Sequence, residues 1–262
     1  MNSTLAIVLV TFLFAAVTAA PQPYQGRPED PEPSITVTTC GGYLDASSAS
    51  IEFQLGGSIR ADMRCVWIVQ APYSMQRFNL VSSGLKETDE LYITTVSAAG
   101  LGNSEKLDTL GQNITLQGRT AMITLVVGHS PTLGFRMEYY ASGSTEVQII
   151  KSHTILTTAK GNLSYPFDGG NYLNNERALF PIAPSVPGHP TLRFTRVDLE
   201  LGSSCQFDSI RIYNWFDWRY LQVAIFCENT IPTSVTFQDG AGVVFFSSDS
   251  SVAKTGFDFQ YE

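Results

Sequence analysis

Three acidic side chains in the C-terminal half of the chain could together bind a cation. Glu200 lies shortly before Cys205, Asp208 lies shortly after it, and Asp249 stands in the serine-rich stretch Phe246–Ser251. If the fold brings these carboxylates together, they repel one another unless a cation holds them. Ligand sets made only of oxygen favour Ca²⁺ over transition metals. The pattern therefore predicts a calcium-stabilised binding module.

Catalytic motifs are missing from the sequence. His129, His153 and His189 all stand in turn-like or linker-like sequence beside Gly, Ser or Pro. The sequence contains no Gly-x-Ser-x-Gly elbow, His-Glu-x-x-His helix, P-loop or dinucleotide fingerprint. We therefore expect a protein that is not an enzyme.

The N-terminus has the pattern of a secretory signal peptide. An apolar run from Leu5 to Val17 is followed by small residues, which predicts a signal peptide over 1–19 with cleavage after Ala19. The run is too short to span a bilayer, and no later stretch reaches the roughly 18 apolar residues of a membrane helix. A buried N-terminal helix is the alternative. We expect a secreted, extracellular protein without membrane insertion.

Charge narrows the range of partners. The chain has 16 basic and 24 acidic residues, a net charge of −8. This balance disfavours nucleic acid and anionic membranes as partners. The sequence carries no signal for a particular oligomeric state.

Four cysteines in a secreted chain allow three disulfide pairings. Cys40 and Cys65 are 25 residues apart, and Cys205 and Cys227 are 22 apart. The spacing favours local pairing within each couple, and each bridge would stabilise the fold by roughly 3–4 kcal/mol. The alternative is a four-cysteine zinc site, although neither couple has the short Cys-x₂₋₄-Cys spacing of such sites.

The rest of the chain has the pattern of an all-β protein. Residues 20–38 are dense in proline and predict an extended or disordered arm. No later segment sustains helical periodicity beyond a turn or two. Gly, Ser, Asn and Pro clusters separate short strands, as in a β-sandwich. Among the predicted strands are Ala121–Val127, Thr191–Leu201, Ser209–Tyr213 and Gly242–Phe246.

An internal repeat indicates two modules. Asp89–Ile93 and Asp208–Ile212 are similar and stand 119 residues apart, and Leu133–Tyr139 and Thr255–Tyr261 stand 122 apart. Two landmarks at nearly the same period predict two copies of a unit of about 105 residues. The predicted boundaries are a first module over 39–141, a linker over 142–153 and a second module over 154–262.

The order of short motifs in each copy is similar to that of CUB domains. The first copy contains Cys40-Gly-Gly, Cys65-Val-Trp67-Ile-Val-Gln-Ala-Pro72, Gly134-Phe135 and Tyr139. The second contains Tyr172, Phe180-Pro-Ile182-Ala-Pro184, Glu200-x₄-Cys205-x₂-Asp208, Cys227, Gly256-Phe257 and Tyr261. The resemblance spans about 39–262 and implies two tandem antiparallel β-sandwiches of a kind common in secreted and cell-surface proteins.

The chain departs from the family in its cysteines. The family usually has two disulfides in each module, whereas each module here retains one. In the second module Ala178 stands where a cysteine would fall, and Glu228 replaces the glycine of a Cys-Gly step. The fold should survive, because the β-core supplies most of the burial energy.

Calcium-binding members of the family surround the ion with a glutamate, two aspartates and a Ser-Asn step. The resemblance implies one Ca²⁺ in the second module, with Tyr172 as a tyrosine that supports the site. The positions that match the ligands are Glu200, Asp208, Asp249 and Ser251, while Val252 replaces the asparagine. The alternative is that Glu200 and Asp208 are solvated loop residues beside a disulfide.

The first module lacks most of this set. Asp89 matches one aspartate, but Ser83-Gly84 and Gly128–Pro131 replace the other acidic positions. We expect no calcium in the first module.

Aromatic residues gather in Asn214–Tyr220, which we expect to be a loop near the calcium site. Trp215, Phe216 and Trp218 are candidates for contact with a protein or sugar. The alternative is that two or three of them turn inward and cap the sandwich.

Two sequons, at Asn113 and Asn162, stand in loop-like sequence. They are candidates for N-glycosylation.

The sequence thus predicts a secreted, non-catalytic protein that binds a protein or glycoprotein partner, with Ca²⁺ ordering the loops of the second module. One alternative is a secreted-fluid effector, similar to seminal-plasma or venom proteins, that binds glycans or cell-surface targets. Another is a regulatory partner of an extracellular protease.

Overall fold

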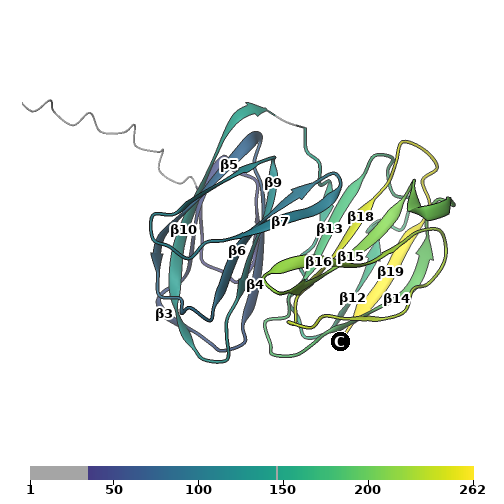
Figure 1. The fold of residues 1–262 in the computed structure, drawn as a ribbon. Helices are drawn as coiled ribbons and strands as arrows, with labels where there is room; N and C mark the ends of the chain where they lie inside the picture. Colours follow the sequence, from purple (N-terminus) through teal and green to yellow (C-terminus); the bar gives the residue numbers. More distant parts are fainter. Residues whose placement is uncertain (1–34, 146) are drawn as a thin grey trace, which may run out of the picture. The chain divides into compact units, whose positions relative to one another are not determined.

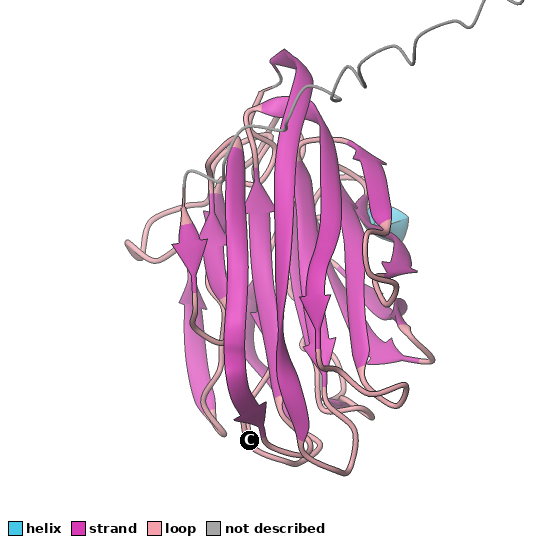
Figure 2. Ribbon diagram, turned by 90° about the vertical axis from the view of Figure 1, so that its left-hand side faces the viewer, coloured by secondary structure: helices cyan, strands magenta, loops and turns pink. Residues whose placement is uncertain are grey.

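The computed structural model describes residues 35–145 and 147–262 and is almost entirely β-strand. Within these residues the only helical segment is the short turn η1 (Ser203–Cys205), as Figure 2 shows. The prediction of an all-β fold is confirmed. No helix in the described ranges is long and apolar enough to cross a membrane. The predicted signal peptide, 1–19, and the arm up to residue 34 lie outside the described residues.

The first sandwich consists of two five-stranded sheets. Its outer sheet has the order β1-β3-β10-β5-β8. Its inner sheet, which faces the second sandwich in Figure 1, has the order β2-β4-β9-β6-β7. β1 takes two residues from the predicted arm. The strands are β1 (Thr36–Val37), β2 (Gly42–Leu44), β3 (Ser48–Ile59), β4 (Arg64–Gln70), β5 (Tyr73–Ser83), β6 (Glu90–Ser97), β7 (Gly100–Lys106), β8 (Asn113–Gln117), β9 (Thr120–Val126) and β10 (Thr132–Thr145).

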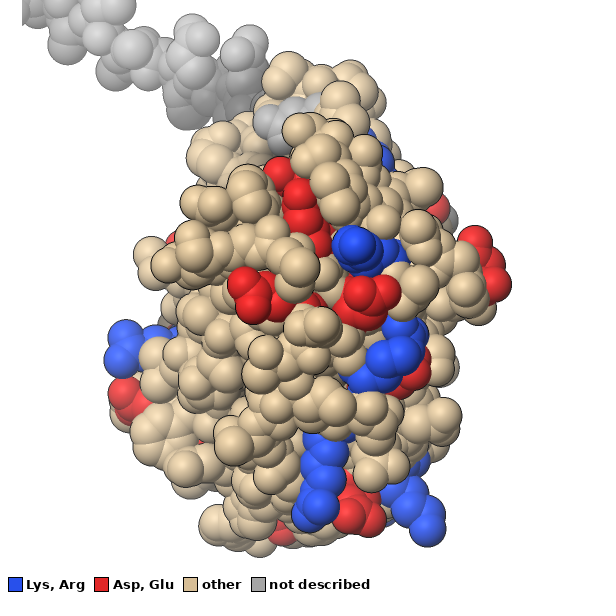
Figure 3. Space-filling model, turned by 90° about the vertical axis from the view of Figure 1, so that its right-hand side faces the viewer, with Lys and Arg blue, Asp and Glu red and all other residues tan. Residues whose placement is uncertain are grey.

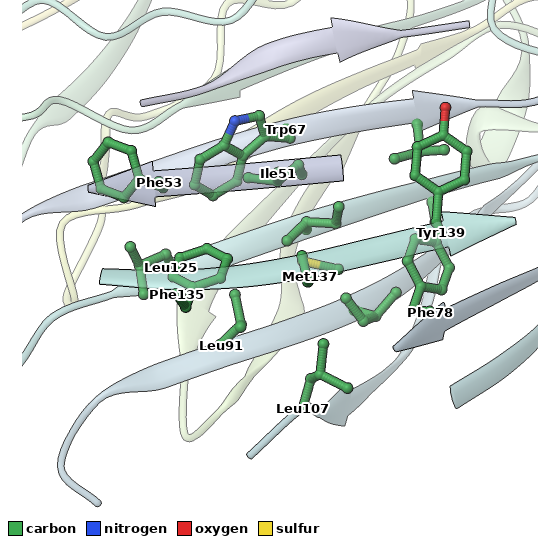
Figure 4. Close-up of a cluster of buried hydrophobic side chains, with 14 of the residues drawn as sticks. Ile51, Phe53, Trp67, Phe78, Leu91, Leu107, Leu125, Phe135, Met137 and Tyr139 are labelled. Carbon is green, nitrogen blue, oxygen red and sulfur yellow. The ribbon is translucent and has the colours of Figure 1, made fainter. Parts of the chain in front are cut away.

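A buried aromatic cluster joins the two sheets of the first sandwich. Trp67 of β4 packs edge-on against Phe53 of β3 and Phe135 of β10, with ring centroids 5.8 and 6.2 Å apart (Figure 4). All three side chains are fully buried. Because side chains alternate along a strand, the outer sheet buries one face here and leaves the other face open.

The second sandwich repeats this arrangement. Its inner sheet has the order β11-β13-β18-β15-β16, and its outer sheet has the order β12-β19-β14-β17. On the face of the molecule that Figure 3 shows, acidic and basic side chains lie interspersed among uncharged ones. The strands are β11 (Ser152–His153), β12 (Gly161–Tyr165), β13 (Arg177–Ile182), β14 (Thr191–Asp198), β15 (Ser209–Phe216), β16 (Arg219–Phe226), β17 (Val235–Thr236), β18 (Gly242–Ser247) and β19 (Gly256–Tyr261).

The repeated landmarks of the sequence occupy matching places. Gly134 lies at the register shift between Leu133 and Phe135 in β10, and Gly256 begins β19, each strand having a neighbour on both sides within an outer sheet. A Cβ atom at Gly134 would lie 2.0 Å from the carbonyl oxygen of Gln54, and one at Gly256 would lie 2.1 Å from that of Tyr165. Both positions therefore exclude any larger residue, which explains the shared Gly-Phe step.

The described residues, 35–145 and 147–262, belong to one compact unit, in which the two inner sheets pack against each other. Their facing sides share a third apolar cluster, distinct from the core of either sandwich. The buried members of this interface cluster are Val66, Ile68, Tyr92, Val96, Met122, Ile150, Leu179, Ala183, Tyr213, Trp215, Tyr220, Ala241, Val243 and Phe245. Central strands of the inner sheets, such as β4, β9 and β18, are thus buried on both faces.

The segment between the sandwiches is shorter than the sequence predicts. β10 continues to Thr145 and β11 begins at Ser152, whereas the predicted linker covers 142–153. The polar sequence of 142–145 conceals the strand, because β10 pairs there with the backbone of β5.

Candidate metal centre

Two loops, the β14–β15 connection and the β18–β19 connection, bring the predicted carboxylates together at one end of the second sandwich. Glu200 follows β14 of the outer sheet, Asp208 directly precedes β15, and Asp249 follows β18. β15 and β18 are neighbours, with Ser209 paired to Ser247. One oxygen from each carboxylate lies within 4.8 Å of the others. The structure therefore assembles the acidic set that the sequence predicts.

Asp208 is fully buried, and both of its oxygens are paired. The backbone N–H of Asp249 donates to Oδ1 at 2.8 Å, and the hydroxyl of Tyr172 donates to Oδ2. The same Tyr172 oxygen accepts from the backbone N–H of Glu200 at 3.2 Å. Tyr172 therefore connects two of the three acidic residues, in the supporting place expected for it.

Glu200 differs from Asp208, because it has an oxygen without a partner. Its side chain is only 9% exposed, and Oε2 is buried with no hydrogen bond in the described structure. Leaving a buried carboxylate oxygen unpaired is costly. A cation between the three carboxylates would remove this cost.

The electrostatics of the site also favour a cation. Burial, followed by the negative charges of Asp249 and Asp208, raises the pKa of Glu200, while Lys254 acts in the opposite direction. Burial and the bond to Asp208 raise the pKa of the Tyr172 hydroxyl, which therefore stays protonated and remains a donor. A hard divalent cation with oxygen ligands fits these donors, and Ca²⁺ is the common extracellular one.

Ser251 and Val252 lie beside the third carboxylate. The backbone N–H of Ser251 donates to Oδ1 of Asp249 at 2.8 Å, and its hydroxyl donates to the same oxygen at 3.3 Å. In this structure Ser251 orients Asp249. Val252 has φ of +50°, a left-handed conformation that suits asparagine far better than a β-branched residue.

Sequence reasoning missed the loop that lines the other side of the site. The side-chain amides of Asn171 and Asn174 donate to the carbonyls of Ala253 and Ser250. Ser248, which is buried, donates through its hydroxyl to the carbonyl of Leu173 at 2.7 Å. The signal was the asparagine-rich run around Tyr172, since short amide side chains commonly bond to nearby backbone.

The first sandwich has a related aspartate, and both of its carboxylate oxygens accept hydrogen bonds from the backbone. Asp89 is buried, and its Oδ1 accepts from the backbone N–H of Gly128 at 3.0 Å, as Asp208 accepts from Asp249. Its Oδ2 accepts from the backbone N–H of Lys86 at 2.6 Å. Asp89 thus shows how an aspartate at this position of a sandwich holds neighbouring backbone segments together through hydrogen bonds.

The two local disulfides are confirmed. Cys40 is bonded to Cys65, and Cys205 is bonded to Cys227. The second bridge ties η1, between Glu200 and Asp208, to the end of β16. The zinc alternative is wrong for these cysteines, because none is free.

The aromatic segment is a hairpin rather than a loop near the metal site. β15 continues to Phe216 and β16 begins at Arg219, so only Asp217 and Trp218 form the turn. β15 has eight residues, which places this turn roughly 25 Å from Asp208. The expected position near the calcium site is therefore wrong.

The three aromatic candidates do not share one environment. Trp215 is fully buried in the interface cluster, which rules it out as a surface contact. The reason is that the first sandwich covers this face, as a hydrogen bond of 2.8 Å from its indole N–H to Glu90 shows. Phe216 and Trp218 remain exposed, Trp218 by 57%.

Both sequons lie in strands, contrary to the expectation of loops. Asn113 begins β8 and Asn162 lies in β12, which are edge strands of the two outer sheets. Both asparagines are exposed, because an edge strand leaves one side unpaired.

Comparison with known proteins identifies the class of the second sandwich. The family model "CUB domain" matches residues 152–261. The resemblance to CUB domains is therefore confirmed for this sandwich, while two tandem CUB domains remain a prediction.

Curated relatives are similar over most of the chain. The exoskeleton protein RP43 of Riftia pachyptila is 24% identical over 207 residues, which cover 75% of this chain and 48% of that protein. Human cubilin is 24% identical over 226 residues, which cover 83% of this chain and 6% of cubilin. The chain thus spans about half of the first relative and a small part of the second.

Solved structures with a partial likeness include two from MASP-1 proteins. The CUB1-EGF-CUB2 domain of human MASP-1/3 is 17% identical, with a TM-score of 0.37, and covers 82% of this chain and 99% of that one. The MASP-1 CUB2 domain bound to Ca²⁺ is 21% identical, also with a TM-score of 0.37, and covers 42% and 96%. At these scores the structural likeness supports no further conclusion.

Proposed function

We propose that this chain is a secreted, non-catalytic protein of two CUB modules whose second module binds one Ca²⁺ through Glu200, Asp208 and Asp249. The observation that carries the proposal is the buried, unpaired Oε2 of Glu200 among three converging carboxylates. The two disulfides support an extracellular location, where such bonds persist.

Calcium would order the loops that present the site to a protein or glycoprotein partner. Three carboxylates and one Ca²⁺ leave a net negative charge. A basic side chain, commonly lysine, is the complementary group on a partner. The acidic net charge of −8 is compatible with this choice.

Thermal unfolding with millimolar Ca²⁺ or with EDTA tests the metal site. With about 1 mM ion and a Kd near ~10⁻⁴ M, binding stabilises the second sandwich by about 1.4 kcal/mol. Asp208→Asn should abolish the response to Ca²⁺. Asp89→Asn is the matched control, because that aspartate makes the same type of backbone bond without the other carboxylates.

The two variants separate the metal from the fold. Both should lower the melting temperature in EDTA, and only Asp208→Asn should lose the rise on adding Ca²⁺. A wild-type protein whose melting temperature is the same in Ca²⁺ and EDTA would exclude the metal site.

The exposed Trp218 favours glycan binding as a second candidate function. It borders an open cavity of about 810 Å³ that also includes Tyr92, Asn103 and Arg219. An exposed ring beside polar side chains suits stacking on a sugar. Glycan binding that is lost in Trp218→Ala and retained in Asp208→Asn would support this function over the calcium-dependent one.

A further inference from the structure

The turn between β6 and β7 of the first sandwich contacts the second sandwich through its backbone. The carbonyl of Ala98 accepts a hydrogen bond from Nε of Arg177 at 3.1 Å, and the carbonyl of Ala99 accepts one from Nη1 of Arg211 at 2.9 Å. The next residue, Gly100, has φ of +115°, and a Cβ there would lie 2.2 Å from the hydroxyl oxygen of Tyr213. The approach is so close that only glycine fits.

Arg177 extends from this turn to the end of β18. Its Nη1 donates to the carbonyl of Glu176 at 2.8 Å and to that of Ser248 at 2.6 Å. Ser248 is buried, and its hydroxyl accepts from the backbone N–H of Glu176 at 2.8 Å. Arg177 therefore clamps the start of β13 and the end of β18 together, while its Nε is held by the first sandwich.

Asp249 follows Ser248 directly, so a shift of Ser248 moves a candidate ligand. A calcium site needs its oxygens to converge at about 2.3–2.6 Å from the ion. We propose that the β6–β7 turn of the first sandwich, acting through Arg177, positions Asp249 and thereby sets the Ca²⁺ affinity of the second sandwich. This inference rests on the proposed calcium site.

Arg177 is proposed to strengthen Ca²⁺ binding by holding the backbone next to Asp249 in place. Its positive charge by itself would weaken Ca²⁺ binding. Its hydrogen bonds run to the carbonyls of Ala98, Glu176 and Ser248, and none of these is a metal ligand. A positive charge near the site disfavours a second cation. Arg177→Lys keeps the charge and loses the rigid fork of donors, so it isolates the positioning role.

Calcium titration calorimetry of the full chain tests the proposal with three variants. Gly100→Ala pushes the turn away from Tyr213, and Arg177→Lys breaks the clamp. Gly118→Ala is the matched control, because Gly118 has φ of +120° and nothing lies within 4 Å of its added Cβ. We expect the Kd for Ca²⁺ to rise by about two- to thirty-fold in the first two variants, the range typical of coupling mutations, and to stay unchanged in the control.

The outcomes distinguish this inference from the function on which it rests. A wild-type chain that binds no Ca²⁺ overturns both. Binding in the wild type with the same Kd in Gly100→Ala and Arg177→Lys overturns only the positioning role. Equal weakening in Gly100→Ala and Gly118→Ala also overturns it, because the effect would then be general backbone strain.

A second measurement needs no variant and guards against one that fails to fold. Coupling between sites is reciprocal, so Ca²⁺ must stabilise the contact that strengthens its binding. Amide hydrogen exchange of residues 97–101 in the wild type should slow on adding Ca²⁺. Exchange of the 117–119 turn should not change. Unchanged exchange at 97–101 overturns the proposal.

Discussion

Asp208 and Glu200 belong to one site but have different dependence on a cation. Both oxygens of Asp208 accept hydrogen bonds within the protein, from Asp249 and Tyr172, so this carboxylate is stabilised without a metal. Glu200 has a buried oxygen with no such partner. At the scale of single residues, a change at Glu200 therefore tests the proposed metal, whereas a change at Asp208 tests the proposed metal and the fold together.

Replacing Glu200 with glutamine should change the pH dependence of stability when calcium is chelated. Burial and the neighbouring carboxylates raise the pKa of Glu200 above its ordinary value of 4.5. The folded state thus holds this proton more tightly than the unfolded chain. Its contribution to the free energy of unfolding is present below the ordinary value and is lost as pH rises through the raised pKa.

Denaturant unfolding in EDTA, from about pH 4 to about pH 7, checks this prediction. Glu200→Gln should gain stability relative to the wild type as pH rises. In millimolar Ca²⁺ the wild type should regain the advantage, because the ion replaces the proton. A constant difference between the two proteins across this range would contradict the prediction.

Val252 should be improvable both for stability and for calcium binding. Its left-handed backbone costs a β-branched residue roughly 1–2 kcal/mol. Val252→Asn should therefore raise the free energy of unfolding by about 1 kcal/mol in EDTA and, by adding a carbonyl oxygen, should also tighten Ca²⁺ binding.

Gln54→Asn is the control for Val252→Asn. Gln54 is exposed and also has φ of +50°, but it lies in the first sandwich. It should gain stability in the same assay and leave the calorimetric Kd for Ca²⁺ unchanged. The idea fails if both variants tighten calcium binding equally.

At the scale of elements, the candidate metal site is built from loops that are anchored at their ends by regular strands. Glu200 stands between the end of β14 and η1, and the backbone N–H of Leu199 donates to the carbonyl of Glu228 at 2.8 Å. The Cys205–Cys227 bridge holds the same two segments together. The loop thus has covalent and hydrogen-bonded support from the segment after β16, in addition to the bond from the Glu200 N–H to the Tyr172 hydroxyl.

Removing this bridge should weaken the fold and the calcium site together. The double substitution Cys205→Ser with Cys227→Ser should cost about 3–4 kcal/mol of unfolding free energy and also raise the Kd for Ca²⁺. Removing Cys40 and Cys65 in the same way opens a loop of similar length and should cost a similar amount. Only the loss of the Cys205–Cys227 bridge should raise the calorimetric Kd for Ca²⁺. An equal loss of calcium binding in both double variants would contradict this.

At the scale of the whole described unit, the two inner sheets pack against each other and form the centre of one folded unit. Each alternates its side chains between its own sandwich core and the interface cluster; in β18, Val244 and Phe246 face the core while Val243 and Phe245 face the other sandwich. The central strands of both inner sheets are buried on both faces, and only edge strands such as β7 and β16 expose side chains to solvent. The two sandwiches should therefore unfold together.

Trp215→Ala tests this cooperativity. The residue is fully buried between the sandwiches, so its truncation should cost about 3–5 kcal/mol. Calorimetry should show one transition in the wild type and a lower midpoint in the variant. Trp218→Ala, which removes an exposed ring, should change stability by about 0.5 kcal/mol or less. Two separate transitions in the wild type would contradict the single body.

Much of the fold follows from local pattern. The predicted strand Gly242–Phe246 is β18 to within one residue, and Ala121–Val127 corresponds to β9. Alternation, turn residues and cysteine spacing act over short distances, which is why they can be interpreted without a structure. The carboxylates were also predictable, because Glu200 and Asp208 flank Cys205 between two predicted strands and match ligand positions of the family that the chain resembles.

Only the tertiary structure shows which surfaces meet. The consecutive apolar residues of β18 indicate burial on both faces, but the partner of the second face is a sheet more than a hundred residues earlier in the chain. For the same reason Trp215 looked like a surface contact, and the link from Gly100 through Arg177 to Asp249 left no local signal. Periodicity records that a side chain is buried, whereas the packing of distant sheets decides what buries it.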